Sequence, residues 1–405
     1  MGSLRSVTLV DLSQRRSFAA GFPHEYFTWL RRHAPVFWHE PTEHTPGGEG
    51  FWVVSRYDDV LTVFKNPATF SSEQGGTQLL DNRRVSNGIT LNQADDPRHH
   101  RLRSLVSAGF TPRTIARLED DLRRQARQIL ADVPIGESFD FVTGVARELP
   151  LQAICNILGV PQEDRTELAD WVDQGVAAAT PEVISRESVK RLGDYGDRLI
   201  AQKRREPADD ILSLIVHARI DDATPQLNDR ELRAFFNLLF LGGVETTRNT
   251  IAGGLLALIE HPDELARLRH EPALLRTGIE EMLRWTSPSV HKRRTATADV
   301  ELGGQRIGRG QKVTIWEMSA NRDERVFAEP FRFDVGRQPN PHVAFGYGPH
   351  FCLGASLARL ELRIMFEELL THFDRFELAG EPSWAPNNRL LGLMELPVRM
   401  TPWAG

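Results

Sequence analysis

The sequence that decides the fold is Phe345-Gly-Tyr-Gly-Pro-His-Phe-Cys-Leu-Gly354, near the C-terminus. Its Phe-x-x-Gly-x-x-x-Cys-x-Gly spacing surrounds the thiol of Cys352 with an aromatic residue and glycines. Glycines let the backbone turn its N–H groups toward a sulfur atom, and an aromatic ring keeps water away from it. A helical pattern over 353–373 would point its positive end at the same sulfur. We therefore predict a thiolate that ligates a metal, whereas Cys155, without such neighbours, is expected to be a buried apolar residue.

This spacing resembles the haem-binding signature of the cytochrome P450 family, in which a cysteine thiolate ligates the iron. The resemblance extends from Pro35 to the C-terminus. It implies haem b as cofactor, with Cys352 as the iron ligand and Phe345, Gly346 and Gly354 in the haem-binding loop. It also implies a mainly α fold with a small β-rich lobe. The haem would lie between a long distal helix and the helix that follows the cysteine loop.

Periodicity supports this fold class. Apolar residues recur at three- and four-residue spacing over 118–130, 192–201, 232–259 and 262–283, which predicts helices. Alternation over 295–315, with turns at Gly303-Gly304 and 308–310, predicts short antiparallel strands. The tail 390–400 is interpreted as a closing hairpin. Since no linker divides the chain, we expect one domain over residues 1–405.

The apolar pattern 232–259 contains polar residues and glycines that could take part in catalysis. Gly242 and Gly243 each weaken a helix by about 1 kcal/mol relative to Ala, so a pair at its middle predicts room for a small molecule. In the resembled family that molecule is dioxygen. Glu245 and Thr246 are then the candidate catalytic residues, relaying the protons needed to cleave the O–O bond. The alternative interpretation is a threonine bonded back to the carbonyl four residues earlier and a glutamate at the surface.

Two further constellations follow from the resemblance. Glu281 and Arg284, spaced i, i+3, can pair on one helical face, and in the family such a pair joins an arginine from a later irregular stretch, for which Arg332 fits. Their role is structural. The haem propionates need cations, and the positions that match by motif and order are His99, Arg103, Arg294 and His350.

Substrate contacts are expected from family position alone. The expected pocket residues are Leu238, Leu239, Gly242, Gly243, Val290, His291, Leu391 and Leu393. The phrases 245–249, 88–92 and 339–345 resemble those of actinobacterial enzymes that hydroxylate sterols, terpenes and lipids. We therefore expect O2-dependent hydroxylation of a hydrophobic small molecule, such as a sterol, terpenoid, lipid or natural-product intermediate.

Composition restricts the partners. The net charge of −6 argues against nucleic acid, because phosphate-binding surfaces are usually basic. Two cysteines cannot form the disulfide framework of a secreted protein, so we expect a cytoplasmic protein. The most apolar stretch, 234–259, carries Glu245 and Arg248, and therefore we expect no membrane span.

The chain carries no flavin or nicotinamide domain, so the resemblance implies electrons from NAD(P)H through a separate ferredoxin and ferredoxin reductase. We expect the partner to dock on a basic patch of Arg101, His350, Arg359 and Arg363, on a monomer. Two alternatives remain open. One is a peroxygenase driven by hydrogen peroxide, which does not need the Glu245–Thr246 pair, and the other is a non-catalytic haem sensor or scaffold.

Overall fold

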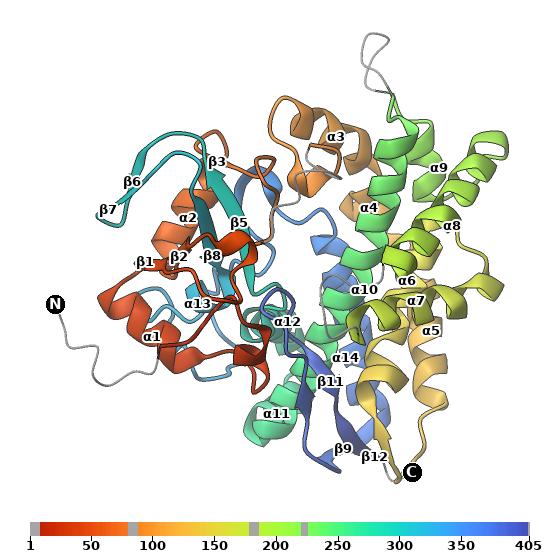
Figure 1. The fold of residues 1–405 in the computed structure, drawn as a ribbon. Helices are drawn as coiled ribbons and strands as arrows, with labels where there is room; N and C mark the ends of the chain where they lie inside the picture. Colours follow the sequence, from red (N-terminus) through yellow and green to blue (C-terminus); the bar gives the residue numbers. More distant parts are fainter. Residues whose placement is uncertain (1–8, 80–87, 178–185, 220–225, 404–405) are drawn as a thin grey trace.

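The computed structural model describes residues 9–79, 88–177, 186–219 and 226–403. Helices fill one side of the molecule, and a five-stranded sheet with α1, α2 and α13 fills the other (Figure 1). Within the described residues, no helix is long and apolar enough to cross a membrane. The expected mainly α fold with a smaller β-rich lobe is confirmed.

The helices agree with the predicted patterns except at one join. In chain order they are α1 (His24–His33), α2 (Tyr57–Lys65), α3 (Arg98–Ser107), α4 (Pro112–Ala116), α5 (Glu119–Ala131), α6 (Glu148–Leu158), α7 (Arg165–Ala177), α8 (Arg186–Arg205), α9 (Ile211–Val216), α10 (Asp229–Glu260), α11 (Pro262–His270), α12 (Leu275–Thr286), α13 (Glu317–Ala320) and α14 (Ala355–His372). The pattern 262–283 is divided between α11 and α12 because Pro272 starts a 3-10 turn there.

The strands form one main sheet and three small ones. They are β1 (Val36–His39), β2 (Phe51–Val54), β3 (Phe70–Ser71), β4 (Ser138–Asp140), β5 (His291–Ala296), β6 (Val300–Leu302), β7 (Gln305–Ile307), β8 (Lys312–Trp316), β9 (Phe373–Leu378), β10 (Ser383–Trp384), β11 (Leu393–Glu395) and β12 (Pro397–Pro402). The main sheet has the order β1-β2-β8-β5-β3, with β2 and β8 parallel. Gly303-Gly304 turns between β6 and β7, where both residues have positive φ.

The predicted closing hairpin at 390–400 is wrong. β11 pairs with β10, whereas β12 lies between β4 and β9 in another sheet. Leu396, which separates the two strands, is fully buried in the helical core. The chain therefore crosses from one sheet to another at this residue, because its apolar neighbours come from remote parts of the sequence.

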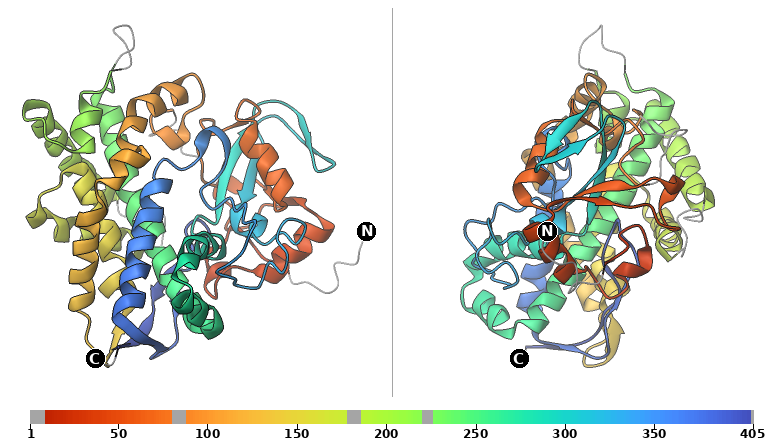
Figure 2. Two further views of the ribbon diagram at one scale, coloured as in Figure 1. Left: turned by 180° about the vertical axis from the view of Figure 1, so that it is seen from behind. Right: turned by 60° about the vertical axis from the view of Figure 1, so that its left-hand side comes forward.

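α10 is the axis of the helical side. Its N-terminus is fixed by a capping box in which Asn228 and Glu231 bond to each other's backbone N–H groups. The helix packs against α6, α8, α12 and α14, and α14 lies between α5 and α12 (Figure 2). The cysteine loop directly precedes α14. The long helix and the helix after the thiol are thus held in one rigid core.

A buried ion cluster on α12 fixes the irregular stretch before the cysteine loop. Glu281 and Arg284 are both fully buried and joined by two hydrogen bonds of 2.7 Å. The third member is Arg337, whose Nε donates to both oxygens of Glu281 at 3.1 Å. The assignment of Arg332 to this place is wrong, because its exposed side chain pairs with Glu329. Arg332 supplies only its carbonyl, which accepts from Arg284 and Arg337.

The neighbouring Glu280 predicts an acid-sensitive contribution to stability. Burial opposes its ionisation, but hydrogen bonds from Arg359 and His342 outweigh burial and lower the pKa to about 2. Because the folded-state pKa lies below the unfolded value, the contribution is complete above pH 4.5 and is lost as pH falls toward 2. We expect Glu280→Gln to lower the free energy of unfolding by about 1–3 kcal/mol at pH 7. Urea unfolding at several pH values should show the difference shrinking below pH 4; a constant difference would contradict the assignment.

Candidate functional site

The loop before Cys352 is closed by its own backbone. The Cys352 N–H donates to the carbonyl of Phe345 at 2.9 Å, and the Gly346 N–H donates to Val343 at 2.8 Å. Gly346 and Gly348 have φ of 72° and 70°, the left-handed region that favours glycine. A Cβ at Gly348 would lie 2.8 Å from the carbonyl oxygen of Phe64. The glycines therefore permit both the turn and its close approach to α2.

The Cys352 thiol is accessible although protein surrounds it. Its side chain is exposed, yet burial among protein atoms raises its pKa, and a hydrogen bond from the Gly354 N–H together with the charges of Lys292 and Arg103 opposes that effect. The Cys352 thiol is thus open to solvent-sized molecules and is at the same time surrounded by protein atoms, as in a recess. By contrast, Cys155 is fully buried in the helical core, and burial raises its pKa to about 12.

An aromatic layer lies beside the loop. Phe345 packs edge-on against Phe351 with ring centroids 6.1 Å apart, and the Arg359 guanidinium lies 4.7 Å from the centre of the Phe345 ring. Phe351 and Tyr347 remain exposed on the outer side. Phe345 thus forms part of an apolar wall next to the thiol, and the exposed rings form the surface over it.

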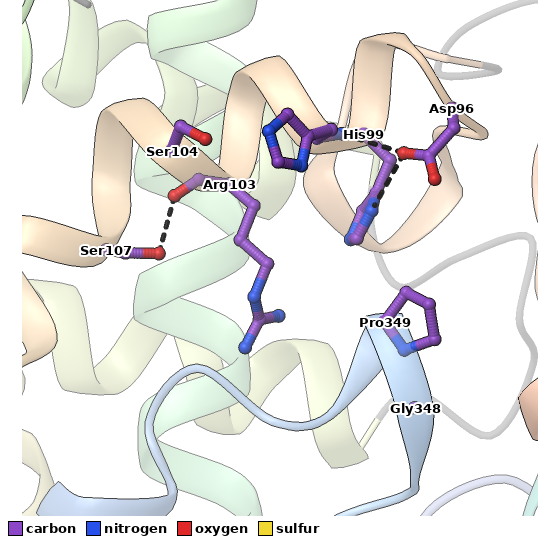
Figure 3. A pocket seen from close by; sticks show the side chains of 8 residues that line it. Asp96, His99, Arg103, Ser104, Ser107, Gly348 and Pro349 are labelled. Atoms are coloured by element: carbon purple, nitrogen blue, oxygen red, sulfur yellow. Dashed lines mark hydrogen bonds and ion pairs between the residues drawn. The ribbon is translucent and has the colours of Figure 1, made fainter.

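Two arginines and two histidines converge beside the cysteine loop. His99 and Arg103 extend from α3 toward Gly348 and Pro349, across a cavity of about 660 Å³ (Figure 3). The rings of His99 and His350 lie 4.1 Å apart. Charges of Arg294 and Arg103 act on His350, whose pKa is lowered to about 2 by burial first and by these cations second. The structure therefore brings together the four residues expected to hold propionates.

The two arginines have few hydrogen-bond partners of their own. Among the described residues, the Arg103 guanidinium has no hydrogen bond or ion pair, and that of Arg294 donates only to the Arg293 carbonyl at 2.9 Å. Nε2 of His99 is buried and has no hydrogen-bond partner. Burial lowers the pKa of Arg294 to about 10, and the charges of Glu317 and Asp95 offset this effect only in part. A dianionic group next to a thiol, as in haem, fits these residues.

The middle of α10 contains an accessible glycine. Gly242 is exposed, and a Cβ there would meet nothing within 4 Å, so one of the two glycines opens into space. Gly243 instead needs to be small because a Cβ would lie 3.1 Å from Ile154. The Thr246 hydroxyl donates to the Gly242 carbonyl at 2.9 Å. This is the backbone hydrogen bond that the alternative interpretation of Thr246 predicts. Glu245 is half-buried.

Several expected pocket residues do not line the cavity. Val290, Leu391 and Leu393 are at most 3% exposed and belong to packed cores. His291 is also buried, with its Nδ1 at 2.7 Å from the Asn388 carbonyl and its ring on Trp316. These assignments are corrected, since packed side chains with so little accessible surface do not contact a ligand. Leu238 and Leu239 on α10 are half-buried and pack against the helical core, and their place in the pocket stays a prediction.

The structure adds polar residues that the sequence interpretation missed. Glu317 on α13 is fully buried and accepts both hydrogen bonds of Lys292. Arg389 is exposed although its neighbour Leu391 is buried. No local sequence pattern predicts the Lys292–Glu317 pair, because the two residues are 25 positions apart in the chain. A signal for Arg389 existed: it is the one charged residue in the turn 387–392.

Comparison with known proteins agrees with this geometry. The family model described as cytochrome P450 matches residues 8–401. A relative from Mycobacterium tuberculosis, "Putative cytochrome P450 126", is 52% identical over 96% of this chain and 97% of its own. The "Methyl-branched lipid omega-hydroxylase" of Mycobacterium bovis is 38% identical over 92% and 90%. The solved structure of Mycobacterium marinum cytochrome P450 CYP268A2 in complex with pseudoionone has a TM-score of 0.88 and 36% identity, over 98% of this chain and 100% of the other.

Proposed function

Since the chain belongs to the cytochrome P450 family, we propose that it hydroxylates a hydrophobic small molecule by inserting one atom of O2. The observation that carries this proposal is the accessible thiol of Cys352 surrounded by protein, in a loop that lies next to two arginines and two histidines. The relatives that hydroxylate lipids, and the pseudoionone complex of a similar structure, support an apolar substrate. We assign the whole of residues 1–405 to one domain.

The family implies haem b. Residues of suitable chemistry are present for its iron and for its propionates. We assign Cys352 as the iron ligand and Phe345, Gly346 and Gly354 as its loop. The arginines Arg103 and Arg294 and the hydrogen-bonding histidines His99 and His350 are assigned as partners of the propionates. When bound, haem supplies dioxygen activation and hydroxylation at its iron. The protein positions the ligand, excludes water and delivers protons.

Glu245 and Thr246 are assigned to proton delivery. Oγ1 of Thr246 holds a proton that it donates to the Gly242 carbonyl, and rotation of this side chain would redirect the donor into the space beside Gly242. Glu245 is adjacent in sequence and half-buried, and Arg389 lies within the range of its charge. A carboxyl group next to a hydroxyl can pass protons inward from solvent.

Thr246→Ala should uncouple electron use from hydroxylation. We expect substrate binding to change little, while product formed per electron falls on the order of a hundredfold, the lower end of the range for general acid–base catalysis. The matched control is Thr250→Ala, which removes a hydroxyl donated to the Thr246 carbonyl one turn along α10. Thr246→Ser should restore coupling. Unchanged coupling in Thr246→Ala would disprove the assignment.

We assign electron supply to a ferredoxin that is reduced by NAD(P)H through a ferredoxin reductase. The basic patch expected from Arg101, Arg359 and Arg363 is neutralised by ion pairs with Glu231, Glu280 and Glu119. Better candidates for contact are the exposed rings of Tyr347 and Phe351 beside the thiol loop, with Lys65 at 5.2 Å from the Tyr347 ring centre. On cysteine content we assign the protein to the cytoplasm. We also propose that it acts as a monomer.

Reconstitution separates this function from its rivals. Holoenzyme with a surrogate ferredoxin, its reductase and NADPH should hydroxylate ligands that shift the Soret band, and hydrogen peroxide should support much slower turnover. Equal or faster turnover with peroxide would favour a peroxygenase. Ligand binding without turnover under both conditions would favour a haem sensor or scaffold.

A further inference from the structure

A buried carboxylate lies directly against the cysteine loop. Glu317, the first residue of α13, is fully buried, and its Oε1 would lie 3.7 Å from a Cβ at Gly346. The same Cβ would lie 3.6 Å from the Phe64 ring of α2, so the two side chains meet at Gly346. The Cys352 N–H donates to the carbonyl of Phe345, the residue before Gly346. The carboxylate therefore lies one residue away from the hydrogen bond that closes the thiol loop.

The other end of α13 is joined to the same loop. The Asn321 N–H donates to the Glu317 carbonyl at 2.8 Å, and Oδ1 of Asn321 accepts from the Val343 N–H at 2.8 Å. The Val343 carbonyl in turn accepts from the Gly346 N–H at 2.8 Å. This chain of hydrogen bonds fixes the position of Glu317 relative to the loop that carries the thiol.

Lys292 supplies the opposite charge from strand β5. Its Nζ donates to both carboxylate oxygens of Glu317 and lies 5.9 Å from the centre of the Phe64 ring. Side chains alternate along a strand, so Lys292 lies on the same face of β5 as Arg294. The Lys292 side chain is 29% exposed, whereas that of Glu317 is 0% exposed. A partly accessible lysine thus neutralises a carboxylate that has no contact with solvent.

The place of this pair points to an electrostatic role. A buried ion pair loses hydration on both members, so it is weak evidence for a contribution to stability. Its charges, however, lie next to the loop of a thiolate. Burial is the main cause of the raised pKa of Cys352; beyond burial, the charge of Lys292 lowers this pKa and that of Glu317 raises it. The two charges act on the thiolate in opposite directions, and their pairing limits the combined effect.

We propose that the Lys292–Glu317 pair sets the reduction potential of the iron that Cys352 ligates, with Glu317 as a fixed negative charge beside the thiolate loop and Lys292 as its neutralising partner. This inference rests on the proposed function, since it requires haem at Cys352. No hydrogen bond joins either side chain to the thiol within the described residues. Both are therefore positioning residues, which act on the iron through the field of their charges.

The sign of the effect follows from the electron that is transferred. The ferric iron gains one electron and becomes ferrous, and the reduced ferredoxin that supplies the electron is oxidised. Since this electron adds negative charge to the site, an unpaired cation nearby favours reduction and an unpaired anion opposes it. In the protein interior such charges are screened less than in water. Loss of one member of the pair should therefore shift the potential, and loss of both should shift it little.

The alternative role is purely structural: the pair would only hold α13 against β5. The two roles predict different results for a double variant. A structural role predicts that a second loss leaves stability lowered and restores nothing. An electrostatic role predicts that removing Lys292 reverses the shift caused by removing the charge of Glu317.

The test measures the midpoint potential of holoenzyme at pH 7 by stepwise reduction with dithionite and mediator dyes, followed at the Soret band. In Glu317→Gln, which keeps the size of the side chain and leaves Lys292 unpaired, we expect the reduction equilibrium constant to rise about tenfold, or about 59 mV. In the double variant Lys292→Met/Glu317→Gln the constant should return to within about twofold of wild type. An unchanged potential in Glu317→Gln, or a double variant that keeps its shift, would overturn the proposal.

A second buried lysine–carboxylate pair provides the matched control. Lys203 of α8 donates to Asp210, which precedes α9, and their side chains are 9% and 6% exposed. Both helices lie on the helical side of the molecule, whereas α13 lies with the sheet (Figure 1). Asp210→Asn also leaves a buried lysine unpaired, but it should keep the reduction equilibrium constant within about twofold of wild type, since charges far from the iron are screened. A shift equal to that of Glu317→Gln would contradict a local effect.

Two further readouts separate the possible failures. If Glu317→Gln does not retain haem, the double variant decides: haem binding with a wild-type potential supports the proposal, and loss of haem or a shifted potential overturns it. If the wild-type carbon-monoxide complex shows the red-shifted band and the potentials do not respond to these changes, the role of the pair fails and the monooxygenase function stands. If wild type lacks that band, thiolate ligation fails, and the proposed function and this inference fail together.

Discussion

Replacing Cys352 by alanine is expected to abolish the red-shifted Soret band of the reduced carbon-monoxide complex and to eliminate monooxygenase activity. That band reports thiolate ligation, and electron donation from the sulfur favours O–O cleavage. Loss of a residue that merely orients a metal ligand costs about 10- to 100-fold in metal affinity or activity, so loss of the ligand should cost more. The measurements are the difference spectrum, the haem content after purification and NADPH-supported turnover.

The chain provides a matched control for this experiment. Cys155 is the only other cysteine, and it is fully buried in the helical core away from the loop. Cys155→Ala should leave the red-shifted band and the turnover intact, with a modest loss of stability from the smaller side chain. If Cys352→Ala kept the red-shifted band, or if Cys155→Ala lost it, the ligand assignment would be wrong.

Breaking the buried ion cluster of α12 should have the largest effect on stability. Arg284 donates to Glu281 twice and to the carbonyls of Asn321, Pro330 and Arg332. Removing one partner leaves the other charge buried without compensation, which costs about 3–5 kcal/mol. We therefore expect Arg284→Gln and Glu281→Gln each to lower the free energy of unfolding by this amount. The measurement is the urea midpoint at pH 7, followed by circular dichroism and by haem absorbance.

Two arginines from the following stretch give an internal comparison. Arg337→Gln should also destabilise strongly, because Arg337 donates to Glu281 and to three carbonyls, those of Ala328, Glu329 and Arg332. Arg332→Gln should change stability by less than about 1 kcal/mol, since its exposed pair with Glu329 is screened by water. A larger loss for Arg332→Gln than for Arg337→Gln would reverse our correction of the cluster.

The sequence by itself was sufficient for the cysteine loop and the architecture. The loop is short, so the spacing of Phe345, the glycines and Cys352 already determines its backbone, and the positive φ values at Gly346 and Gly348 follow from local sterics. The helices α5, α8, α10 and α14 follow from apolar periodicity. Family order also predicted two arginines and two histidines as partners of the propionates; the structure places these residues near one another, and their role stays a prediction.

Tertiary structure alone decided which side chains meet. Arg337 rather than Arg332 reaches Glu281, because the irregular backbone between them turns one side chain inward and the other toward solvent. β11 and β12 belong to different sheets, since Leu396 is buried between them. Val290, Leu391 and Leu393 pack in cores, while Arg389, two residues before Leu391, is exposed. Local periodicity predicts helices, strands and short loops, but contacts between residues more than 50 positions apart depend on how those elements pack, which no local pattern contains.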